Sequence, residues 1–545
     1  MLQTSNYQAF SILSFEATGA AIAAETILHS FTGPAKAGRA LPGDFVEWVP
    51  AEERCALVNR TIHAPLTGLL DVCSKTIYGM TSRHVPIFLF YPYDKRYPPM
   101  RVGCSTADRS SNLLVTVRFE DWPAGETFPR ANLETVIGPV GDILTEAKAL
   151  VSYASPYWRA KSTYTEPVAA ASRHVPLPDT EPQPWSIFHI DPEGCCDVDD
   201  VVGIQERADG RTNLLIGISD VAAYVDAGST LDKIAFHNTA TVYTLGGTAV
   251  RPMFPAALSE GRFSLLPDGR EKLIIGLTCI YDGNQLTNIS FGEYKAVINR
   301  TYSYESAAED ARLAGILGGV AATVARRVAG PTSILNVREI SRDSHAWIEQ
   351  LMIFYNMEAA SRLAAAGTGI FREHAAARAE QLDAVRLLPA ELQWIAANPA
   401  SYTAATDSMH TTAGQNCYCH VTSPIRRYVD LYNQRALKAI LNASQAATRT
   451  STYIVQHLNT RQKVMKKYQR NLTFITHILG NDTKEIDATV VSVGETKARL
   501  WIHNWATLVN TIEYDGLVIG DKVRLRFYYN PNRPNWKERI VFERV

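Results

Sequence analysis

Short apolar runs separated by turn residues dominate the first part of the chain. FVEWV follows LPGD, VPIFLFY precedes PYDKRYPP, and LLVTVRF precedes EDWPAGE. Apolar runs of this length, bounded by Pro, Gly and Asp, are typical of antiparallel strands. The pattern predicts two small β-barrels, one at residues 1–80 and one at residues 81–155.

The pattern changes further along the chain. Strand-like runs such as EKLIIGLTCIY give way to apolar residues at three- and four-residue spacing, as in HAWIEQLMIFYNMEAASRLAAA, which predicts a sheet plus helices at residues 185–480. The Pro-rich, polar segment 156–184 before it is expected to be a linker. Short strands return in DATVVSVG, ARLWIHN and KVRLRFYY, which predicts an OB-type barrel at residues 485–545. The expected fold class is therefore α+β and multidomain.

The composition agrees with a folded protein of several domains. The 545 residues exceed what one core usually holds, and 46% hydrophobic with 20% charged residues is a globular balance. No run approaches the roughly 20 apolar residues of a membrane span, and the start MLQTSNYQAFSILSF lacks a basic n-region. We expect an intracellular, cytoplasmic protein with no membrane partner.

Charge and cysteine usage exclude some classes of function. A formal net charge of -1 argues against a protein that simply coats nucleic acid, so any nucleic-acid path must be a local basic channel. The 8 cysteines form no CxxC pair, and reduced thiols are expected. Cys417, Cys419 and His420 could suggest a soft-metal site, but the second ligand pair of a zinc site is missing.

An acidic cluster carries the first candidate chemistry. The segment IFHIDPEGCCDVDDVVGI holds four aspartates within ten residues: Asp191, Asp197, Asp199 and Asp200. A solvated acidic turn or a calcium-type loop are the alternatives, but apolar residues flank the cluster on both sides. Carboxylates held near a core need a cation, and oxygen ligands select Mg²⁺ or Mn²⁺. The cluster predicts a divalent-metal site that hydrolyses phosphodiester bonds.

The segment YCHVTSPIRRYVDLYNQRALKAIL carries the second constellation. The triplet TSP is expected to start a helix, which would place Arg426 and Arg427 in its first turn. Cations are electrostatically misplaced at the positive end of a helix, so a buried anion such as a scissile phosphate would resolve the cost. Surface ion pairing to Asp430 is the alternative.

These motifs resemble the ribonuclease II (RNB) family of exoribonucleases. IDPEGCCDVDD is similar to the family's acidic signature and HVTSPIRRY to its arginine signature, with SDVAAYV, LDKIAFHNTATVY, RPMFPAALSEGRFSLLP, WIEQLMIFYNMEA and IFREH between them in the family's order. The resemblance covers roughly residues 185–475. It implies a central RNB catalytic domain, two cold-shock-type OB barrels before it and an RNA-binding OB barrel after it. RALPGDFVEW and IGPVGDILTE look most like the exosome-associated eukaryotic-type branch, and we expect the layout of that branch without its extra endonuclease domain.

The resemblance implies processive 3′-to-5′ hydrolysis of single-stranded RNA to nucleoside 5′-monophosphates, with Mg²⁺ as cofactor and Mn²⁺ as its alternative. By position in the motifs, all four aspartates would be metal ligands, and Asp199, Asp200 and Arg426 would be catalytic. Three residues would contact RNA: Tyr243 by stacking on the terminal base, Glu349 at the ribose, and Arg427. A core tyrosine and a helix-surface glutamate remain the alternatives for the first two.

Several positions depart from the family pattern. Gln434 and Arg435 stand where a His-Arg pair is usual, and Gly217 to Asp220 replace a His-Ile-Ala-Asp block. These departures put substrate handling in doubt more than chemistry. A catalytically inactive RNB-fold protein, serving as an RNA-binding or structural subunit of a larger RNA-processing assembly, is therefore the rival prediction. A DNA exonuclease is a third, because clustered aspartates do not select ribose.

Overall fold

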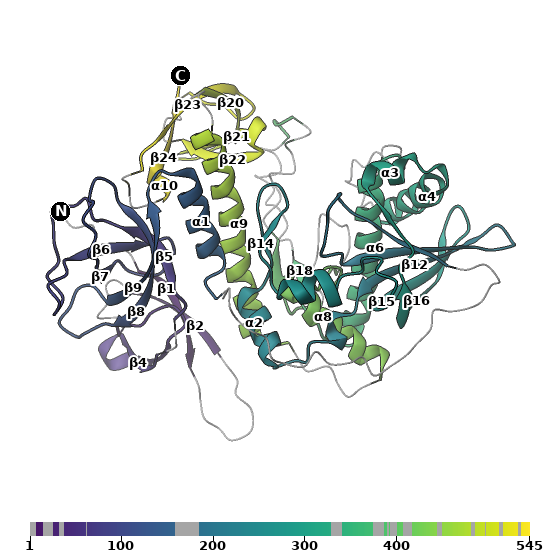
Figure 1. Cartoon of the computed structure of the whole chain (residues 1–545), viewed down its shortest axis with the longest axis horizontal. Coiled ribbons are helices and arrows are strands. Elements are labelled where there is room, and N and C mark those ends of the chain that lie inside the picture. Colours follow the sequence, from purple (N-terminus) through teal and green to yellow (C-terminus); the bar gives the residue numbers. More distant parts are fainter. Residues whose placement is uncertain are drawn as a thin grey trace. The chain divides into compact units, whose positions relative to one another are not determined.

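The structure is a computed structural model of the chain, drawn in Figure 1. It describes residues 7–14, 25–31, 38–60, 63–157, 185–328, 340–373, 386–389, 392, 400–406, 417–443, 450–480, 485–495, 497–511, 516–531, 533 and 536–545. Two compact units are formed, one by residues 1–157 with 466–545 and one by residues 158–465. Most of the expected linker lies outside the described residues. Within them no helix has the length and apolar character needed to cross a bilayer.

A closed five-stranded barrel is the centre of the first unit. Its strand order is β5-β6-β7-β9-β8, with bounds Leu66–Leu70, Ile87–Pro92, Met100–Gly103, Arg130–Pro139 and Leu113–Asp121. Helix α1, Ile143–Ala154, follows β9 and is capped by Asp142, whose carboxylate accepts from the Thr145 backbone N–H. The apolar runs of the sequence thus form a barrel as predicted.

The expected boundary at residue 80 is wrong for this barrel. All five residues of β5 are buried, and the strand pairs with both β6 and β8, so the barrel cannot close without it. The described strands before it form two ladders, β1 (Tyr7–Ser14) with β2 (Glu25–Phe31) and β3 (Phe45–Val49) with β4 (Arg54–Asn59). The sequence of a fully buried strand does not indicate which barrel the strand belongs to.

The same unit contains the last five strands. They are β20 (Glu485–Val493), β21 (Ala498–Ile502), β22 (Thr507–Thr511), β23 (Lys522–Tyr529) and β24 (Ile540–Arg544), in the order β22-β21-β20-β23-β24. Side chains along β23 alternate between exposed and buried, which is the pattern of a sheet with one face on a core. The long helix α9, Thr452–Gly480, leads into this C-terminal sheet, and α10 spans Trp536–Arg539.

A fully buried ion pair joins the closed barrel and the C-terminal segment of this unit. The Arg539 guanidinium donates to both carboxylate oxygens of Glu146 on α1, at 3.1 and 3.2 Å, and neither side chain is exposed. The Tyr529 hydroxyl and the Gly141 backbone N–H also donate to Glu146, at 2.9 and 3.1 Å. The carboxylate therefore has its cationic partner only when the C-terminal segment is present.

A six-stranded sheet organises the second unit, in the order β16-β15-β12-β11-β10-β17. The strands are β10 (Ser186–Ile190), β11 (Asp200–Glu206), β12 (Thr212–Ser219), β15 (Glu271–Tyr281), β16 (Leu286–Val297) and β17 (Arg300–Tyr302). Only the β10–β17 pair among them is parallel. Helices of this unit are α2 (Thr230–Asn238), α3 (Tyr304–Glu309), α4 (Ala311–Val328), α6 (Ser344–Ala365) and α8 (Tyr428–Leu441).

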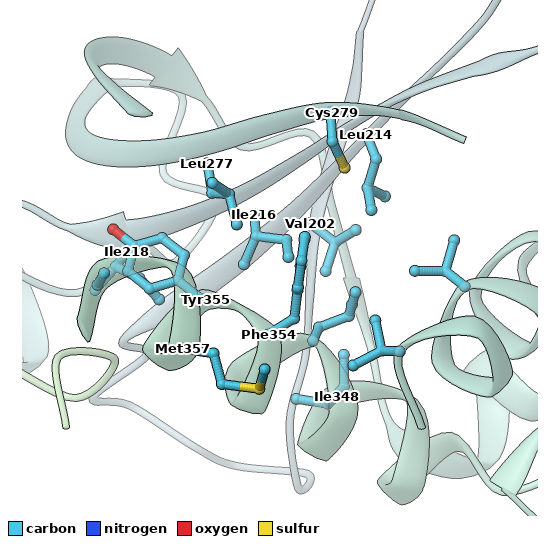
Figure 2. Packing of buried hydrophobic residues seen from close by; sticks show 14 of the residues in the cluster. Val202, Leu214, Ile216, Ile218, Leu277, Cys279, Ile348, Phe354, Tyr355 and Met357 are labelled. Atoms are coloured by element: carbon cyan, nitrogen blue, oxygen red, sulfur yellow. The ribbon is translucent and has the colours of Figure 1, made fainter. Parts of the chain in front are cut away.

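Helix α6 covers one face of this sheet. Figure 2 shows side chains of β11, β12 and β15, including Ile216 and Leu277, packed against Phe354 and Met357 of the helix. The Tyr355 hydroxyl, buried in the same layer, donates to the Ile275 carbonyl at 2.9 Å. Burial of this apolar layer fixes the sheet, and with it the strand ends that carry the aspartates.

Candidate functional site

The strand ends place the first aspartate. β10 and β11 are antiparallel neighbours, so the loop that connects them lies at one end of the two strands. Asp191 is at the start of this loop and Asp200 is at its end. The Asp191 backbone N–H donates to the Tyr302 carbonyl of β17 at 3.2 Å. Its carboxylate lies 3.0 Å from Nδ1 of the buried His189, whose Nε2 contacts the Thr301 hydroxyl. We call residues 191–200 the carboxylate loop.

Asp197 is held from a different element. The Tyr243 hydroxyl donates to Asp197 Oδ2 at 2.6 Å, and Tyr243 ends the short strand β13, Val242–Tyr243. Burial raises the pKa of the Tyr243 phenol, and the hydrogen bond to Asp197 raises it further. The phenol therefore stays protonated and keeps donating at neutral pH. The two residues expected for base stacking and metal binding are in direct contact.

Asp199 connects the carboxylate loop to the arginine motif. Its Oδ1 accepts from the Ile425 backbone N–H at 2.9 Å, and its Oδ2 accepts from Arg426 Nε at 3.0 Å. Burial raises the pKa of Asp199 to about 7, against the lowering effect of Arg426. The Arg426 side chain remains 45% exposed, so the guanidinium can still meet a ligand.

Asp200 is surrounded by like charges. Its pKa is raised well above the usual value, first by burial and then by the carboxylates of Asp191 and Asp199. Carboxylates that repel one another in a buried place are stabilised by a cation. The donor set therefore fits a hard divalent cation such as Mg²⁺.

The four side chains do not converge on one point. Among the described His, Cys, Asp and Glu side chains, no group of three or more could hold one metal ion as they stand. The hydrogen bonds explain this arrangement, since Asp191 turns to His189, Asp197 to Tyr243 and Asp199 to Arg426. Metal binding by all four would require at least some of these bonds to be exchanged.

The arginine motif does not start a helix as expected. The α8 helix begins at Tyr428, and Arg427 is its N-cap with an extended backbone of φ -137° and ψ 124°. A bridge between Arg427 and Ala240, with the Tyr428 N–H donating to the Thr239 carbonyl at 2.8 Å, keeps the preceding residues out of the helix. This tertiary pairing overrides the local helix signal, and residues 423–427 form what we call the arginine loop.

Buried protein carboxylates supply the anions that the two arginines need. Arg427 Nη2 donates to Asp430 Oδ1 at 2.8 Å, and Asp430 is fully buried, so this pair is not a surface one. The Ser423 hydroxyl accepts from Nη2 of Arg426 at 3.0 Å and from Nη2 of Arg427 at 3.1 Å. A bound phosphate is not needed to explain their position, and Arg427 is directed inward.

An aromatic pair beside the carboxylates was not singled out from the sequence. Tyr304, the first residue of α3, stacks on His345 of α6 with ring centroids 3.6 Å apart and planes 19° apart. Burial and the charges of Asp191 and Asp200 raise the pKa of Tyr304 to about 12, which reflects its closeness to the carboxylate loop. Nothing in the spacing of these two residues in the sequence signals the contact.

Glu349 makes no contact with described residues that would assign it to the site. It is an exposed residue of α6, and in the part of the chain that the structure describes it makes no hydrogen bond or ion pair with the carboxylate loop. The helix-surface alternative agrees with this position. A contact to ribose stays a prediction.

The departures from the family pattern fall on packing residues. Gln434 is fully buried, and its amide donates to the Ser219 carbonyl at 2.7 Å while accepting from the Ala222 N–H at 2.9 Å. Arg435 donates to Asp232 and to the Val225 carbonyl, both at 2.7 Å. Through these hydrogen bonds both residues connect α8 to the segment that follows β12. The doubt that they raised about substrate handling is therefore not supported by their contacts.

Fold and site together define a class of protein that combines an RNB domain with OB-type barrels. The RNB domain family matches residues 181–315 and 327–443, and the Dis3-like cold-shock domain 2 (CSD2) family matches residues 87–153. The first match contains both the carboxylate loop and the arginine loop, and the second contains strands β6 to β9 with most of α1. The chain therefore contains an RNB domain.

Curated relatives are exonucleases by name. The chain is 26% identical to the human exosome complex exonuclease RRP44 over 259 residues, which are 46% of this chain and 25% of that protein. It is 26% identical to exoribonuclease 2 of Buchnera aphidicola over 350 residues, 52% of this chain and 54% of the relative. The chain thus spans a quarter and about half of these two proteins.

Solved structures share the fold. Mycoplasma genitalium RNase R in complex with ribose methylated single-stranded RNA superposes with a TM-score of 0.69 at 16% identity, covering 98% of this chain and all of that one. Yeast Ssd1, a pseudonuclease, gives a TM-score of 0.64 at 18% identity, covering 88% of this chain and 68% of that one. The same architecture thus occurs in a nuclease and in a pseudonuclease.

Proposed function

We propose that the chain is a metal-dependent exoribonuclease that degrades single-stranded RNA processively from its 3′ end and releases nucleoside 5′-monophosphates. The observation that carries the proposal is the bond between Asp199 and Arg426, which joins the carboxylate loop to a half-exposed guanidinium. Phosphoryl displacement needs carboxylates that hold a cation and a second positive group for developing charge, and both are adjacent here. The RNB domain of the chain and the names of its relatives agree with this chemistry.

Each residue has a role in the proposal. Asp191, Asp197, Asp199 and Asp200 would hold Mg²⁺, or Mn²⁺ as its alternative, and the bound ion would polarise the scissile phosphate and activate water. Asp199 also orients Arg426 through Nε, which leaves the rest of the guanidinium to stabilise the transition state. Asp200 lies beside these groups, where the Asp191 and Asp199 charges raise its pKa. The cation would relieve that repulsion.

Two residues, one half-buried and one exposed, are the candidates for substrate contacts. The Tyr243 ring would stack on the terminal base, a contact that tolerates any base. Glu349 would accept from the ribose, and only a contact to the 2′-hydroxyl could select RNA over DNA. The inward bonds of Arg427 favour a supporting role for that residue, with Ser423 and Asp430, over direct contact with RNA.

A second candidate function is an RNA-binding or structural subunit without activity. The observation that favours it is that Asp191, Asp197 and Asp199 are each engaged with protein partners, and a pseudonuclease has the same fold. RRP44 is named as a component of an exosome complex, so a larger assembly is part of this candidate. Such a subunit would bind RNA without shortening it.

A gel assay with a 5′-labelled single-stranded oligoribonucleotide and Mg²⁺ separates these functions. We expect stepwise shortening from the 3′ end by the wild type, none by Asp199→Asn, and unchanged shortening by Asp226→Asn, an exposed aspartate of the same unit. Equal rates for Asp199→Asn and wild type would contradict the proposal. Tight binding without cleavage under Mg²⁺ and Mn²⁺ would favour the inactive subunit, and equal degradation of a matched DNA oligomer would favour a DNA exonuclease.

A further inference from the structure

His189 is a buried histidine beside an expected metal ligand, and both of its ring nitrogens are engaged. It is 2% exposed and lies on β10, two residues before Asp191. Nδ1 lies 3.0 Å from Oδ2 of Asp191, and Nε2 lies 2.9 Å from the Thr301 hydroxyl oxygen. We propose that His189 is a positioning residue that leaves Asp191 one oxygen for a cation, so that the site prefers Mg²⁺ over Ca²⁺. This inference rests on the proposed function, which makes Asp191 a metal ligand.

The sheet determines where the imidazole points. Side chains alternate along a strand, so His189 lies on the face opposite to Phe188 and Ile190, which pack in the layer covered by α6. Thr301 is the partner of His189 in the parallel ladder of β10 and β17. Rotation of the buried ring would break both of its contacts and leave polar atoms without partners, which costs free energy. The imidazole is therefore held in one orientation.

The chemistry of the partners gives the direction of these contacts. A carboxylate only accepts hydrogen bonds, so Nδ1 of His189 donates to Asp191, and the Thr301 hydroxyl is able to donate to Nε2. The Asp191 backbone N–H is engaged as well, with the Tyr302 carbonyl at 3.2 Å. Main chain and side chain of Asp191 are therefore both fixed.

Asp191 differs from the other two engaged carboxylates in what it leaves for an ion. Both oxygens of Asp199 accept hydrogen bonds from the arginine loop. Oδ2 of Asp197 accepts from the Tyr243 hydroxyl, and the Cys195 thiol is directed at Oδ1 at 3.9 Å. Oδ1 of Asp191 has no hydrogen bond among the described residues, and this side chain is 20% exposed. Asp191 can therefore bind an ion and keep its present hydrogen bond.

One available oxygen suits a small octahedral ion. Mg²⁺ needs near-ideal octahedral geometry with short bonds, whereas Ca²⁺ accepts longer bonds, more ligands and both oxygens of one carboxylate. While His189 engages Oδ2, Asp191 offers an ion only Oδ1, and Ca²⁺ then has one ligand fewer. The same hydrogen bond orients Oδ1 before the ion binds, which favours Mg²⁺. Loss of the bond should therefore weaken Mg²⁺ binding and not Ca²⁺ binding.

The test compares two amides that replace different nitrogens of the histidine. Asparagine places its N–H group near the position of Nδ1 and glutamine near that of Nε2. His189→Asn therefore keeps the bond to Asp191, and His189→Gln keeps only the bond to Thr301. Mg²⁺ and Ca²⁺ are titrated separately into the metal-free full chain without RNA, and the heat of binding is measured. The heat that Asp191→Asn removes belongs to this site, and near-UV circular dichroism reports whether each variant is folded.

We expect wild type and His189→Asn to bind Mg²⁺ more tightly than Ca²⁺. His189→Gln should lose about 10-fold in Mg²⁺ affinity and keep its Ca²⁺ affinity. Thr301→Val, at an exposed position of the edge strand β17, should lose part of the preference, because the ring is no longer held from its other side. The inference is overturned if the two amides give the same ratio of Kd values, or if wild type does not prefer Mg²⁺. If neither amide variant folds, an unchanged ratio in Thr301→Val overturns it.

Failure of this inference and failure of the proposed function are distinguishable. Cleavage of RNA by a wild type whose two amide variants share one ratio of Kd values would contradict only the inference. A preference for Mg²⁺ that depends on His189, in a chain that does not shorten RNA, would contradict only the proposed exoribonuclease.

Discussion

The Tyr243 hydroxyl donates a hydrogen bond of 2.6 Å to Oδ2 of Asp197. One residue can therefore serve both the terminal base, through its ring, and an expected metal ligand, through its hydroxyl. These two contributions are separable by mutation, because phenylalanine keeps the ring and removes only the donor.

We expect Tyr243→Phe to keep the KM for RNA and to lower kcat, since Asp197 loses the bond that orients it. Tyr243→Ala should also raise KM, because stacking on one base contributes about 1–3 kcal/mol. Steady-state kinetics on a single-stranded oligoribonucleotide measure both effects. Equal KM changes for the two variants would show that the ring does not stack on the substrate.

The raised pKa of Asp199 predicts a stability that depends on pH. Between pH 4 and 7 the folded state, with a pKa of about 7, keeps a proton that an unfolded aspartate has already released. The free energy of unfolding therefore falls as pH rises through this window. In EDTA, we expect Asp199→Asn to be more stable than wild type at pH 8 by on the order of 2–4 kcal/mol. Urea unfolding from pH 4 to 8 checks this, and a difference that is constant with pH would contradict it.

Divalent cation binding should stabilise the folded chain. A bound Mg²⁺ would relieve the repulsion among Asp191, Asp199 and Asp200, and an ion at 100 times its Kd stabilises by about 2.7 kcal/mol. We expect Mg²⁺ to raise the Tm of wild type and EDTA to abolish cleavage. Asp200→Asn should raise the Tm without metal and remove most of the response to Mg²⁺. An unchanged Mg²⁺ response in Asp200→Asn, followed by thermal unfolding, would place the ion elsewhere.

Substitutions of the two neighbouring arginines should affect different properties: stability for Arg427 and activity for Arg426. Arg427→Ala leaves the fully buried Asp430 charge without its cation, which costs about 3–5 kcal/mol of unfolding free energy. Arg426→Ala should cost less stability, because the exposed guanidinium loses little packing and Asp199, with its raised pKa, can take up a proton, but it should lower kcat by about 10²–10³. Urea unfolding and single-turnover cleavage measure the two quantities. The double variant Arg427→Ala, Asp430→Asn should recover part of the stability, and no recovery would mean that the lost packing dominates.

The buried Gln434 is expected to act on folding and not on RNA. Gln434→Leu leaves the Ser219 carbonyl and the Ala222 N–H without partners, at a cost of about 2–4 kcal/mol. Filter binding with an unreactive Asp199→Asn background should give the same RNA Kd with and without Gln434→Leu. A clear loss of RNA affinity in a folded variant would return this position to the substrate path.

Sequence patterns identified both loops of the candidate site but not how their side chains pair. The carboxylate loop was predictable because four aspartates lie between two apolar runs that become β10 and β11. Which partner each carboxylate takes depends on residues far along the chain, such as Ile425 for Asp199 and Tyr243 for Asp197. Such contacts leave no periodic signal in a single sequence.

The predicted boundaries of elements were wrong where pairing with a distant segment competed with local conformational preference. The TSP triplet has the chemistry of a helix start, yet the bridge of Arg427 to Ala240 delays α8 to Tyr428. In the same way, Leu66–Leu70 is assigned to its barrel by pairing with β8, which follows much later. Local propensity predicts the kind of element, and tertiary pairing decides where the element begins.

The buried pair of Glu146 and Arg539 has a consequence for the order in which parts of the chain can fold. The two residues are 393 positions apart, so a nascent chain displays α1 and its carboxylate long before the guanidinium has been synthesised. An unpaired carboxylate cannot be buried cheaply, so α1 cannot settle in its final environment during that interval. We therefore expect the first barrel to complete its folding only after the C-terminal strands have been synthesised.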